Sequence, residues 1–399
     1  MKLTAGVCLF RLLCTVFVCA VYVECQTRGA ADESSNRDRP GQQPADVSQS
    51  KYPAHPDKID EYIKREMAAR NVPGLAFAVM ENGRALRQGA YGLANLETGA
   101  PVGIDSVFEL ASVTKPITAV AVMMLVEQKK LALDDPVDKY LAEIPAAWHA
   151  ITVRELLSHT SGRREYGLVR CDGSELLDIS TKQQFEDLVK SPLLFVPGTG
   201  TQYSDSGYFV LGMIIESVSG QRYRDFLQQR IFGPLGMPHT SVLDQSAIIP
   251  NRISSYTLRK GQLKNARRAW QHELPSWYGI WSTVEDMVKF DAGLSSGALI
   301  KLETLAHMWA PATLKDGKNS SIDQNLYGLG WFILSAAGHR IVGHPGWTGT
   351  LYLKYRDDQI SIILLANLDA GSGSQHVFLA QAILELLRPG LARFLPKEK

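Results

Sequence analysis

Residues 109 to 119 read ELASVTKPITA, and they place Ser112 three residues before Lys115 at the start of an apolar segment. On a helix this spacing puts both side chains on one face, so the lysine can take or relay the proton of the serine hydroxyl. The spacing alone is weak evidence, because the chain repeats it at Ser48 and Lys51 within polar sequence. Context separates the two copies, since the first is followed by the run ITAVAVMMLV, which predicts a buried helix. Ser112 is therefore a candidate nucleophile whose partners must lie elsewhere in the chain.

A second candidate group is Tyr203 with Asp205, in a predicted loop after a Pro-Gly pair and before another apolar helix. A tyrosine beside a lysine can act as general base toward a serine hydroxyl. The alternative is a core tyrosine, and the same spacing recurs at Tyr355 and Asp357 on a predicted strand. The loop position favours Tyr203.

A third candidate group lies in VGHPGWTGTLYL, where His344, Pro345 and Gly346 end one predicted strand and the next begins near residue 350. A glycine in an edge strand allows a substrate to approach the backbone closely. The amide of Trp347 could then join that of Ser112 as an oxyanion hole. The alternative is a histidine at the end of a strand in a glycine-rich turn.

A rival nucleophile is Ser295, in the sequence GLSSG, which matches the nucleophile elbow of the α/β-hydrolases. That elbow requires a strand before the serine and a helix after it. Here a helix predicted to begin at Ser282 precedes the motif, so its glycines indicate the end of a helix. The histidines show no zinc-ligand spacing, and no phosphate-binding glycine loop follows a strand. The sequence therefore gives little support to a metal or nucleotide site.

The order of the predicted elements indicates an α/β fold. A helix is expected over residues 56 to 70, and Asn82-Gly83 predicts a hairpin between two strands. Capping boxes at Thr152/Glu155 and Ser282/Glu285 predict helix starts in a mostly helical region, residues 112 to 292. Strand patterns return in four segments before a last amphipathic helix over residues 375 to 387: YGLGWFILSA, HRIVGH, TLYLKYRD and QISIILLANL. We expect the N- and C-terminal strands to form one antiparallel sheet flanked by helices, with the helical lobe inserted.

The composition is that of a globular protein with a sizeable core. The 399 residues are 45% hydrophobic and 21% charged, and the net charge is +1. Without a basic or acidic run, the chain has no electrostatic reason to bind nucleic acid. A small-molecule substrate is the expected partner, and the sequence leaves the oligomeric state open.

The first 25 residues predict a secretory signal peptide. Lys2 and Arg11 precede a twelve-residue apolar run, which is short for a membrane span. Cleavage near Cys25 would yield an exported protein, periplasmic or secreted, while an N-terminal membrane anchor remains an alternative. Cleavage would also leave Cys171 as the single cysteine of the mature chain. Residues 26 to 52 are polar and predict a disordered linker, so the folded domain is expected over 53 to 399.

Taken in order, the three groups resemble the Ser-x-x-Lys, Tyr-x-Asn and Lys/His-x-Gly motifs of the serine β-lactamase and penicillin-binding-protein superfamily. Segments between them, including FELASVTKPITA, LLSHTSG, GPLGM and YGLGW, resemble its class C β-lactamase-like branch, which also holds family VIII esterases and D-stereospecific peptidases. The resemblance extends from about residue 56 to 390. It implies the β-lactamase/transpeptidase-like fold and no cofactor.

The resemblance also implies roles for the candidate residues. Ser112 would be acylated, with Lys115 and Tyr203 handling its proton. The amides of Ser112 and Trp347 would hold the oxyanion, and His344 would replace the usual lysine ahead of Gly346.

Two departures from the family pattern bear on the substrate. Asp205 stands where an asparagine normally donates to a substrate carbonyl, and a carboxylate can only accept. It could pair with Lys115, raise the pKa of that lysine and shift the role of base toward Tyr203. Pro345 replaces a residue that commonly contacts a substrate carboxylate, and it has neither hydroxyl nor N–H.

These departures favour a hydrolase of small esters or related amides, acting through an acyl-enzyme at Ser112. One alternative is a β-lactamase or a D-Ala-D-Ala carboxypeptidase or D-aminopeptidase. Another is a penicillin-binding or sensor module that is acylated without turnover.

Overall fold

The computed structural model describes residues 58–142, 144–163, 177–242, 244, 246–266, 270–336, 338–369 and 375–391. The predicted signal peptide and linker, the Ser48 to Lys51 pair and Cys171 lie outside the described residues. None of the helices in the described ranges is long and apolar enough to span a bilayer.

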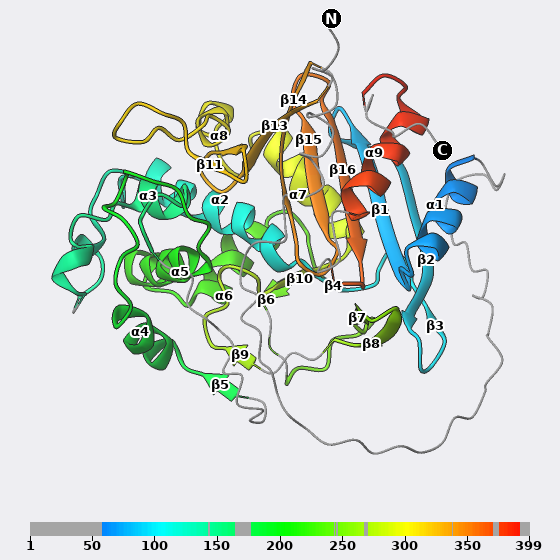
Figure 1. Ribbon diagram of the computed structural model, residues 1–399, viewed down its shortest axis with the longest axis horizontal. Coiled ribbons are helices and arrows are strands. Elements are labelled where there is room, and N and C mark those ends of the chain that lie inside the picture. The colour runs from blue at the N-terminus through cyan, green and yellow to red at the C-terminus, as the bar shows by residue number, and fades with distance from the viewer. Residues whose placement is uncertain are drawn as a thin grey trace, which may run out of the picture.

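The chain begins with a helix and four strands, continues through a mostly helical middle region, and ends with six strands and a last helix (Figure 1). The helices are α1 Lys58–Ala69, α2 Thr114–Glu127, α3 Val153–Leu157, α4 Thr181–Val189, α5 Asp205–Ser219, α6 Tyr223–Leu227, α7 Val284–Ser295, α8 Leu302–Met308 and α9 Gln375–Leu387. The N-terminal strands are β1 Gly74–Glu81, β2 Arg84–Asn95, β3 Ala100–Pro101 and β4 Phe108–Glu109. The middle strands are β5 Leu177–Ile179, β6 Ser241–Val242, β7 Tyr256–Arg259, β8 Gln262–Asn265, β9 Trp270–His272 and β10 Ile280–Ser282. The C-terminal strands are β11 Ser321–Ile322, β12 Asn325–Tyr327, β13 Phe332–Ala336, β14 His339–Pro345, β15 Leu351–Tyr355 and β16 Ile360–Ala366.

The main sheet joins the two ends of the chain, as the sequence predicted. Its nine strands run in the order β11-β12-β13-β14-β15-β16-β1-β2-β3, and every neighbouring pair is antiparallel. β1 pairs with the C-terminal β16 on one side and with β2 on the other. The turn between β1 and β2 is Asn82-Gly83, and both residues have positive φ, as a two-residue hairpin turn of this type requires.

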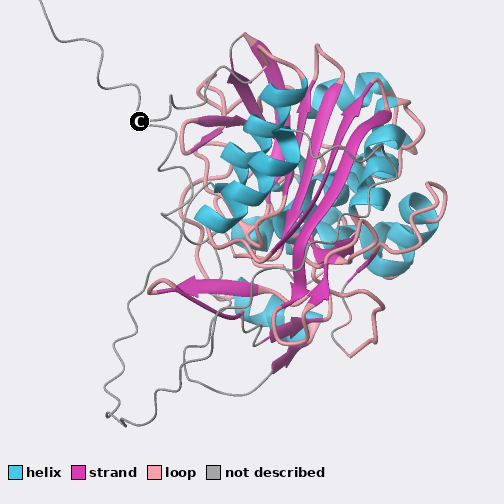
Figure 2. Ribbon diagram, turned by 90° about the vertical axis from the view of Figure 1, so that its right-hand side faces the viewer, coloured by secondary structure: helices cyan, strands magenta, loops and turns pink. Residues whose placement is uncertain are grey.

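Helices cover both faces of this sheet, which explains why its central strands are apolar throughout. Side chains alternate along β1, so Leu75, Phe77 and Val79 pack with buried residues of α1 and α9. Ala76, Ala78 and Met80 point to the opposite face, into the core that α2, α5 and α7 share. Figure 2 shows helices on either side of the long strands.

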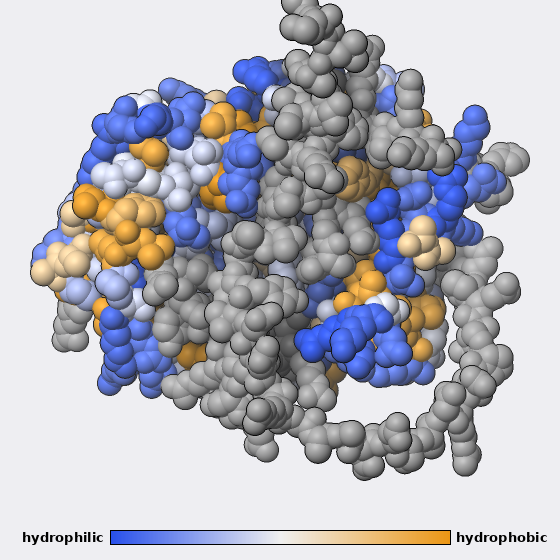
Figure 3. All heavy atoms as spheres, viewed as in Figure 1, coloured by the Kyte–Doolittle hydropathy of each residue, from blue (hydrophilic) through white to orange (hydrophobic). Residues whose placement is uncertain are grey.

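The region between β3 and β11 carries most of the helices; α7 packs on the sheet, against β1 and β16, whereas α3, α4, α5 and α6 lie to one side of it (Figure 1). It also contains strands β4 to β10, in small sheets that the sequence did not predict. The β7–β8 hairpin is one of these, and Figure 3 shows that its surface is covered by hydrophilic side chains.

One predicted helix start is confirmed and one is wrong. Thr152 and Glu155 form the expected capping box of α3. At α7 the capping residue is Thr283 rather than Ser282, and its hydroxyl accepts from the N–H of Asp286 at 3.1 Å. Ser282 instead ends β10, where it pairs with Phe108 of β4. Tertiary strand pairing therefore moves the cap by one residue.

Candidate active site

Ser112 and Lys115 lie at the junction between a 3₁₀ turn, Ala111–Val113, and helix α2. Every residue of α2 from Thr114 to Leu125 is buried, and the side chain of Lys115 is fully enclosed. Its Nζ donates to Ser112 Oγ at 3.1 Å. Ala111, immediately before the serine, has a φ of 47°, which is unusual for a residue with a Cβ. The backbone is thus held in a strained turn at the position where it presents Ser112.

Lys115 has three acceptors around its ammonium group. Besides Ser112 Oγ, these are Asp205 Oδ1 at 2.6 Å and the carbonyl oxygen of Trp277 at 3.2 Å. The contacts to Ser112 and Trp277 are hydrogen bonds, and the contact to Asp205 is an ion pair. The expected pairing of Asp205 with Lys115 is therefore present, and the lysine donates to the serine rather than accepting from it.

Tyr203 and Asp205 are brought to this lysine by the start of α5. Ser204 is the N-cap residue, and its hydroxyl accepts from the N–H of Gly207 at 3.2 Å. The ring of Tyr203 lies under the ammonium, with Lys115 Nζ 4.7 Å from the ring centroid. Asp205 is the more open member of the ion pair, with 26% of its side chain exposed.

The third candidate group is held against the serine turn by two hydroxyl hydrogen bonds. After β14, Thr348 donates to the carbonyl of Glu109 at 2.7 Å and Thr350 donates to that of Leu110 at 2.8 Å. A Cβ at Gly346 would lie 2.4 Å from the Leu110 oxygen, so only glycine fits this approach. Trp347 follows and is 54% exposed. The structure thus places this strand end beside the residues that lead into Ser112.

His344 is buried and electrically neutral. Its Nδ1 is 2.7 Å from the carbonyl oxygen of Pro345, and its ring centroid is 6.1 Å from that of Tyr203. Burial, together with the nearby Lys115 charge, lowers the pKa of His344 to about 3. The residue that stands in the third motif is therefore no cation at neutral pH.

Two further residues belong to the site although the sequence reasoning gave them no role. His159, in the turn after α3, is buried, and its ring centroid is 4.4 Å from that of Tyr203. Its Nδ1 accepts a hydrogen bond from the N–H of Ser204 at 3.1 Å. Tyr327, at the end of β12, lies 4.7 Å from the His159 ring, centroid to centroid. The quoted segments LLSHTSG and YGLGW contain both residues, but their contacts come from distant parts of the chain.

The rival nucleophile is not placed in such a site. Ser295 is the last residue of α7, whose N-cap residue is Thr283, and Gly297 beyond it has a φ of 76°. GLSSG therefore ends a helix, as predicted, instead of forming a strand-to-helix elbow. The hydroxyl of Ser295 donates to the carbonyl of Asp291 at 2.7 Å.

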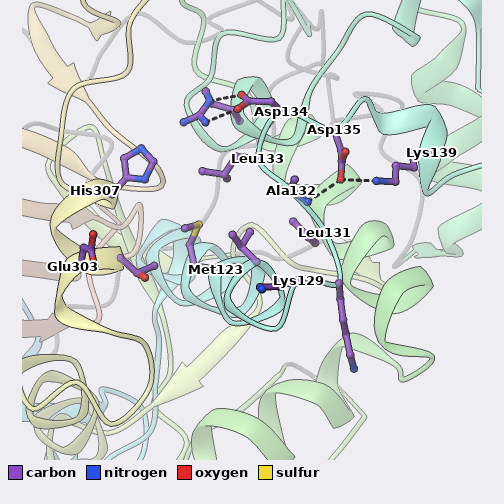
Figure 4. Close-up of a pocket in the computed structure, with 14 residues that line it drawn as sticks. Met123, Lys129, Leu131, Ala132, Leu133, Asp134, Asp135, Lys139, Glu303 and His307 are labelled. Carbon is purple, nitrogen blue, oxygen red and sulfur yellow. Dashed lines mark hydrogen bonds and ion pairs between the residues drawn. The ribbon is translucent and has the colours of Figure 1, made fainter.

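A groove of about 670 Å³ lies at the opposite end of α2 from Ser112 (Figure 4). Met123, Leu131 and Leu133 line it together with charged side chains. Two of its acids are already paired, Asp134 with Arg154 and Asp135 with Lys139. Since α2 has 14 residues, the groove is roughly 20 Å from the serine and is not part of the candidate site.

Comparisons with known proteins agree with this architecture. The sequence profile of the Beta-lactamase family matches residues 59–385. The chain is 30% identical to Penicillin-binding protein 4* of Bacillus subtilis (strain 168) over 325 residues, which are 76% of this chain and 70% of that protein. It is 35% identical to Esterase EstB of Burkholderia gladioli over 195 residues, 45% of this chain and 50% of the esterase. Among solved structures, the octameric penicillin-binding protein homologue from Pyrococcus abyssi superposes with a TM-score of 0.73 at 26% identity, covering 85% of this chain and 79% of that one.

Proposed function

The chain belongs to the Beta-lactamase family of serine hydrolases, and on that premise we propose that it forms an acyl-enzyme at Ser112 and hydrolyses small esters or related amides. The observation that carries this proposal is the hydrogen bond from the enclosed Lys115 to Ser112 Oγ, made beside Asp205 and Tyr203. Lys115 is fully enclosed, but its partner Asp205 keeps 26% of its side chain exposed, so this ion pair is open to an approaching substrate, as expected of a functional site.

In the proposed acylation step, Ser112 Oγ bonds to the carbonyl carbon of the ester. Tyr203 takes the hydroxyl proton, because Lys115 already donates to Ser112 and Trp277 and is paired with Asp205, and because a cation beside the Tyr203 ring favours negative charge on the phenol oxygen. The backbone amides of Ser112 and Trp347 would stabilise the oxyanion. When the tetrahedral intermediate collapses, the bond to the leaving alcohol breaks and that oxygen receives the proton.

Deacylation repeats the same steps with water as the nucleophile. The water oxygen bonds to the acyl carbon, and Tyr203 accepts a proton from that water. Collapse of the second intermediate breaks the bond to Ser112 Oγ, which is protonated again, and releases the carboxylic acid.

The preference for esters rests on three side chains around the serine. His344 is neutral and buried, so it offers no positive charge to a substrate carboxylate. Pro345 has neither a hydroxyl nor an N–H to donate. Asp205 is bound to Lys115 as an acceptor and cannot donate to a substrate amide carbonyl. A neutral ester needs none of these missing contacts.

The deciding experiment assays the parent and Ser112→Ala side by side on p-nitrophenyl esters, a chromogenic cephalosporin and D-amino-acid amides. We expect ester turnover that the substitution abolishes. Undiminished ester turnover in the variant would contradict the assignment of Ser112. Catalytic turnover of the cephalosporin or of the amides, without ester turnover, would favour a β-lactamase or a D-peptidase. Labelling of Ser112 without product release would favour a module that does not turn over.

The substitution Asp205→Asn tests whether this residue sets the preference for esters over amides. The amide restores a donor at this position, so we expect amide and cephalosporin turnover to rise about tenfold relative to ester turnover, the effect of one hydrogen bond. Comparing substrates within one variant cancels any change in the reactivity of Lys115. An unchanged ratio would mean that Asp205 does not set the substrate class.

We also propose export after cleavage near Cys25, on the sequence pattern of residues 1 to 25 alone. N-terminal sequencing of the protein recovered from its native host tests this. A mature chain that begins near residue 26 is expected, and one that retains residues 1 to 25 would contradict cleavage.

A further inference from the structure

Three buried polar atoms next to the candidate site have no hydrogen-bond partner within the described ranges of the chain. They are Nε2 of His159, the hydroxyl of Tyr327 and Nε2 of His344. The rings that carry them are in contact, with centroids 4.7 Å apart for His159 and Tyr327 and 6.1 Å apart for Tyr327 and His344. Buried polar groups are nearly always hydrogen-bonded, so three unpaired atoms in one packed cluster require an explanation.

The bonds on the other side of each histidine fix which nitrogen carries the proton. The N–H of Ser204 donates to His159 Nδ1, so the proton of this neutral ring must be on Nε2. The carbonyl of Pro345 can only accept, so His344 Nδ1 carries the proton and Nε2 has the lone pair. Burial lowers the pKa of both histidines far below neutrality, so each ring carries a single proton.

The three unpaired atoms are therefore a donor on His159, an acceptor on His344 and, between them, a hydroxyl that can be both. Their polarity is matched in one direction, from His159 through Tyr327 to His344. The Tyr208 hydroxyl, which donates to the carbonyl oxygen of Leu157 at 2.9 Å, is a competing acceptor for the Tyr327 proton, and the histidine resonances distinguish the two. Opposite tautomers of the two histidines are required for this match, and the Ser204 and Pro345 bonds impose them.

We propose that the Tyr327 hydroxyl, directly or through a buried water, accepts from His159 Nε2–H and donates to His344 Nε2. This relay would join the turn after α3, the end of β12 and the end of β14 behind the ring of Tyr203. His159 also holds Ser204, the cap of the helix that begins with Asp205. His159 and Tyr327 are thus positioning residues, and their effect on turnover rests on the proposed function.

The chain offers a matched control for this relay. Tyr355 also carries a buried hydroxyl without a partner among the described residues, but it belongs to the core that α1 and α9 cover. If such hydroxyls were merely tolerated, phenylalanine at either position would be neutral or stabilising. If Tyr327 bridges the two histidines, removing its hydroxyl leaves a buried donor on His159 and a buried acceptor on His344 without a partner.

The first test compares Tyr327→Phe with Tyr355→Phe. We expect Tyr327→Phe to lower kcat for the best ester roughly 10- to 100-fold, with little change in KM and a lower melting temperature, because Tyr203 loses its support. Tyr355→Phe should leave kcat within about twofold. Equal behaviour of the two variants would overturn the proposal.

The second test does not depend on turnover. Nitrogen NMR of protein labelled with ¹⁵N-histidine should show His159 protonated on Nε2 and His344 on Nδ1, and Tyr327→Phe should shift the Nε2 resonances of both. The same tautomer on both rings, or shifts that ignore Tyr327→Phe, would refute the relay. If the parent hydrolyses no ester, the proposed function fails while the tautomers still decide the relay.

Discussion

Two buried lysines in this protein have closely similar surroundings. Lys115 Nζ contacts an aspartate, a serine hydroxyl and a backbone carbonyl. Lys354 Nζ, in strand β15, contacts Asp291 at 3.0 Å, Ser295 at 2.8 Å and Ser361 at 3.0 Å. The second cluster even includes the serine of the GLSSG motif.

The two clusters differ in the hydrogen bonds that the serine donates and in the burial of the carboxylate. Ser295 donates its proton to a backbone carbonyl, whereas Ser112 donates no hydrogen bond within the described part of the chain. Asp291 is almost fully buried and also accepts from Ser361 at 2.7 Å and from Tyr352 at 2.5 Å. We therefore expect a serine beside a lysine to be reactive where its own hydroxyl donates no hydrogen bond, and the same groups to stabilise the fold where it does.

The serines themselves should show the largest difference. Ser112→Ala should reduce ester turnover by at least about 10⁴-fold, because the nucleophile is lost. Ser295→Ala should leave turnover within about twofold, since its hydroxyl serves the end of α7. Initial rates on a p-nitrophenyl ester, with circular dichroism as a folding control, check both. A comparable loss in Ser295→Ala would remove the distinction.

The tyrosine beside each lysine provides the next comparison. Tyr203→Phe should lower kcat by about 10³-fold, the contribution of a general base, with little change in stability. Tyr352→Phe should keep kcat within about twofold and destabilise the fold by about 2 kcal/mol, because a hydrogen bond to a buried carboxylate is lost. Steady-state kinetics and urea unfolding measure the two effects. A loss of stability in Tyr203→Phe without a kinetic effect would show that Tyr203 is structural and is not the general base.

Removing the charge of Asp291 tests whether the Lys354 cluster is structural. Asp291→Asn leaves the buried Lys354 without a counter-charge, so we expect the free energy of unfolding to fall by about 3 kcal/mol. Ester turnover by the folded fraction should be unchanged. Thermal unfolding followed by an assay well below the transition separates the two quantities, and a selective loss of turnover would show that this cluster also serves catalysis.

Acid should weaken the site cluster through its histidines. The folded-state pKa of His344 is about 3, below the usual 6.5, so between these values the unfolded chain binds a proton that the folded chain does not. The free energy of unfolding should therefore fall as the pH drops below 6.5, by roughly 2 kcal/mol at pH 5 for this residue. Urea unfolding of the parent and His344→Gln at pH 7 and 5 should show a shallower dependence in the variant. Ser295→Ala, in the other cluster, should keep the parent's dependence.

Local patterns predicted the sheet and the helices around it well, because burial on both faces of β1 and β16 leaves an apolar signal in the sequence. The short strands β5 to β10 were missed for the opposite reason. They have two to four residues each, and β5, β6, β9 and β10 owe their extended form to distant partners, as in the pairing of β5 with β9. The shift of the α7 cap from Ser282 to Thr283 has the same cause. β7 and β8 form a local hairpin, but they are mostly exposed and leave no apolar signal.

The site was predictable where a motif is compact and unpredictable where contacts are long-range. The spacing of Ser112 and Lys115 anticipated their hydrogen bond, and the unusual Asp205 anticipated the ion pair. Nothing in the sequence near His159 indicates that it would accept from Ser204, 45 residues later, or lie against Tyr327. Likewise, only the fold shows that Thr348 and Thr350 fasten the third group to the serine turn.

The pairing of β1 with β16 has a consequence for how the protein is made. Leu75 and Ala366 are partners across that ladder, about 290 residues apart in the chain. At typical synthesis rates of about 5–20 residues per second, β1 waits roughly 15–60 s for the strand that completes its hydrogen bonds. During that interval one edge of an apolar hairpin stays open, and such edges readily pair with other chains. Ser112 is translated early, but the strand end that contacts its turn arrives more than two hundred residues later, so a truncated chain carries the candidate nucleophile without the rest of its candidate site.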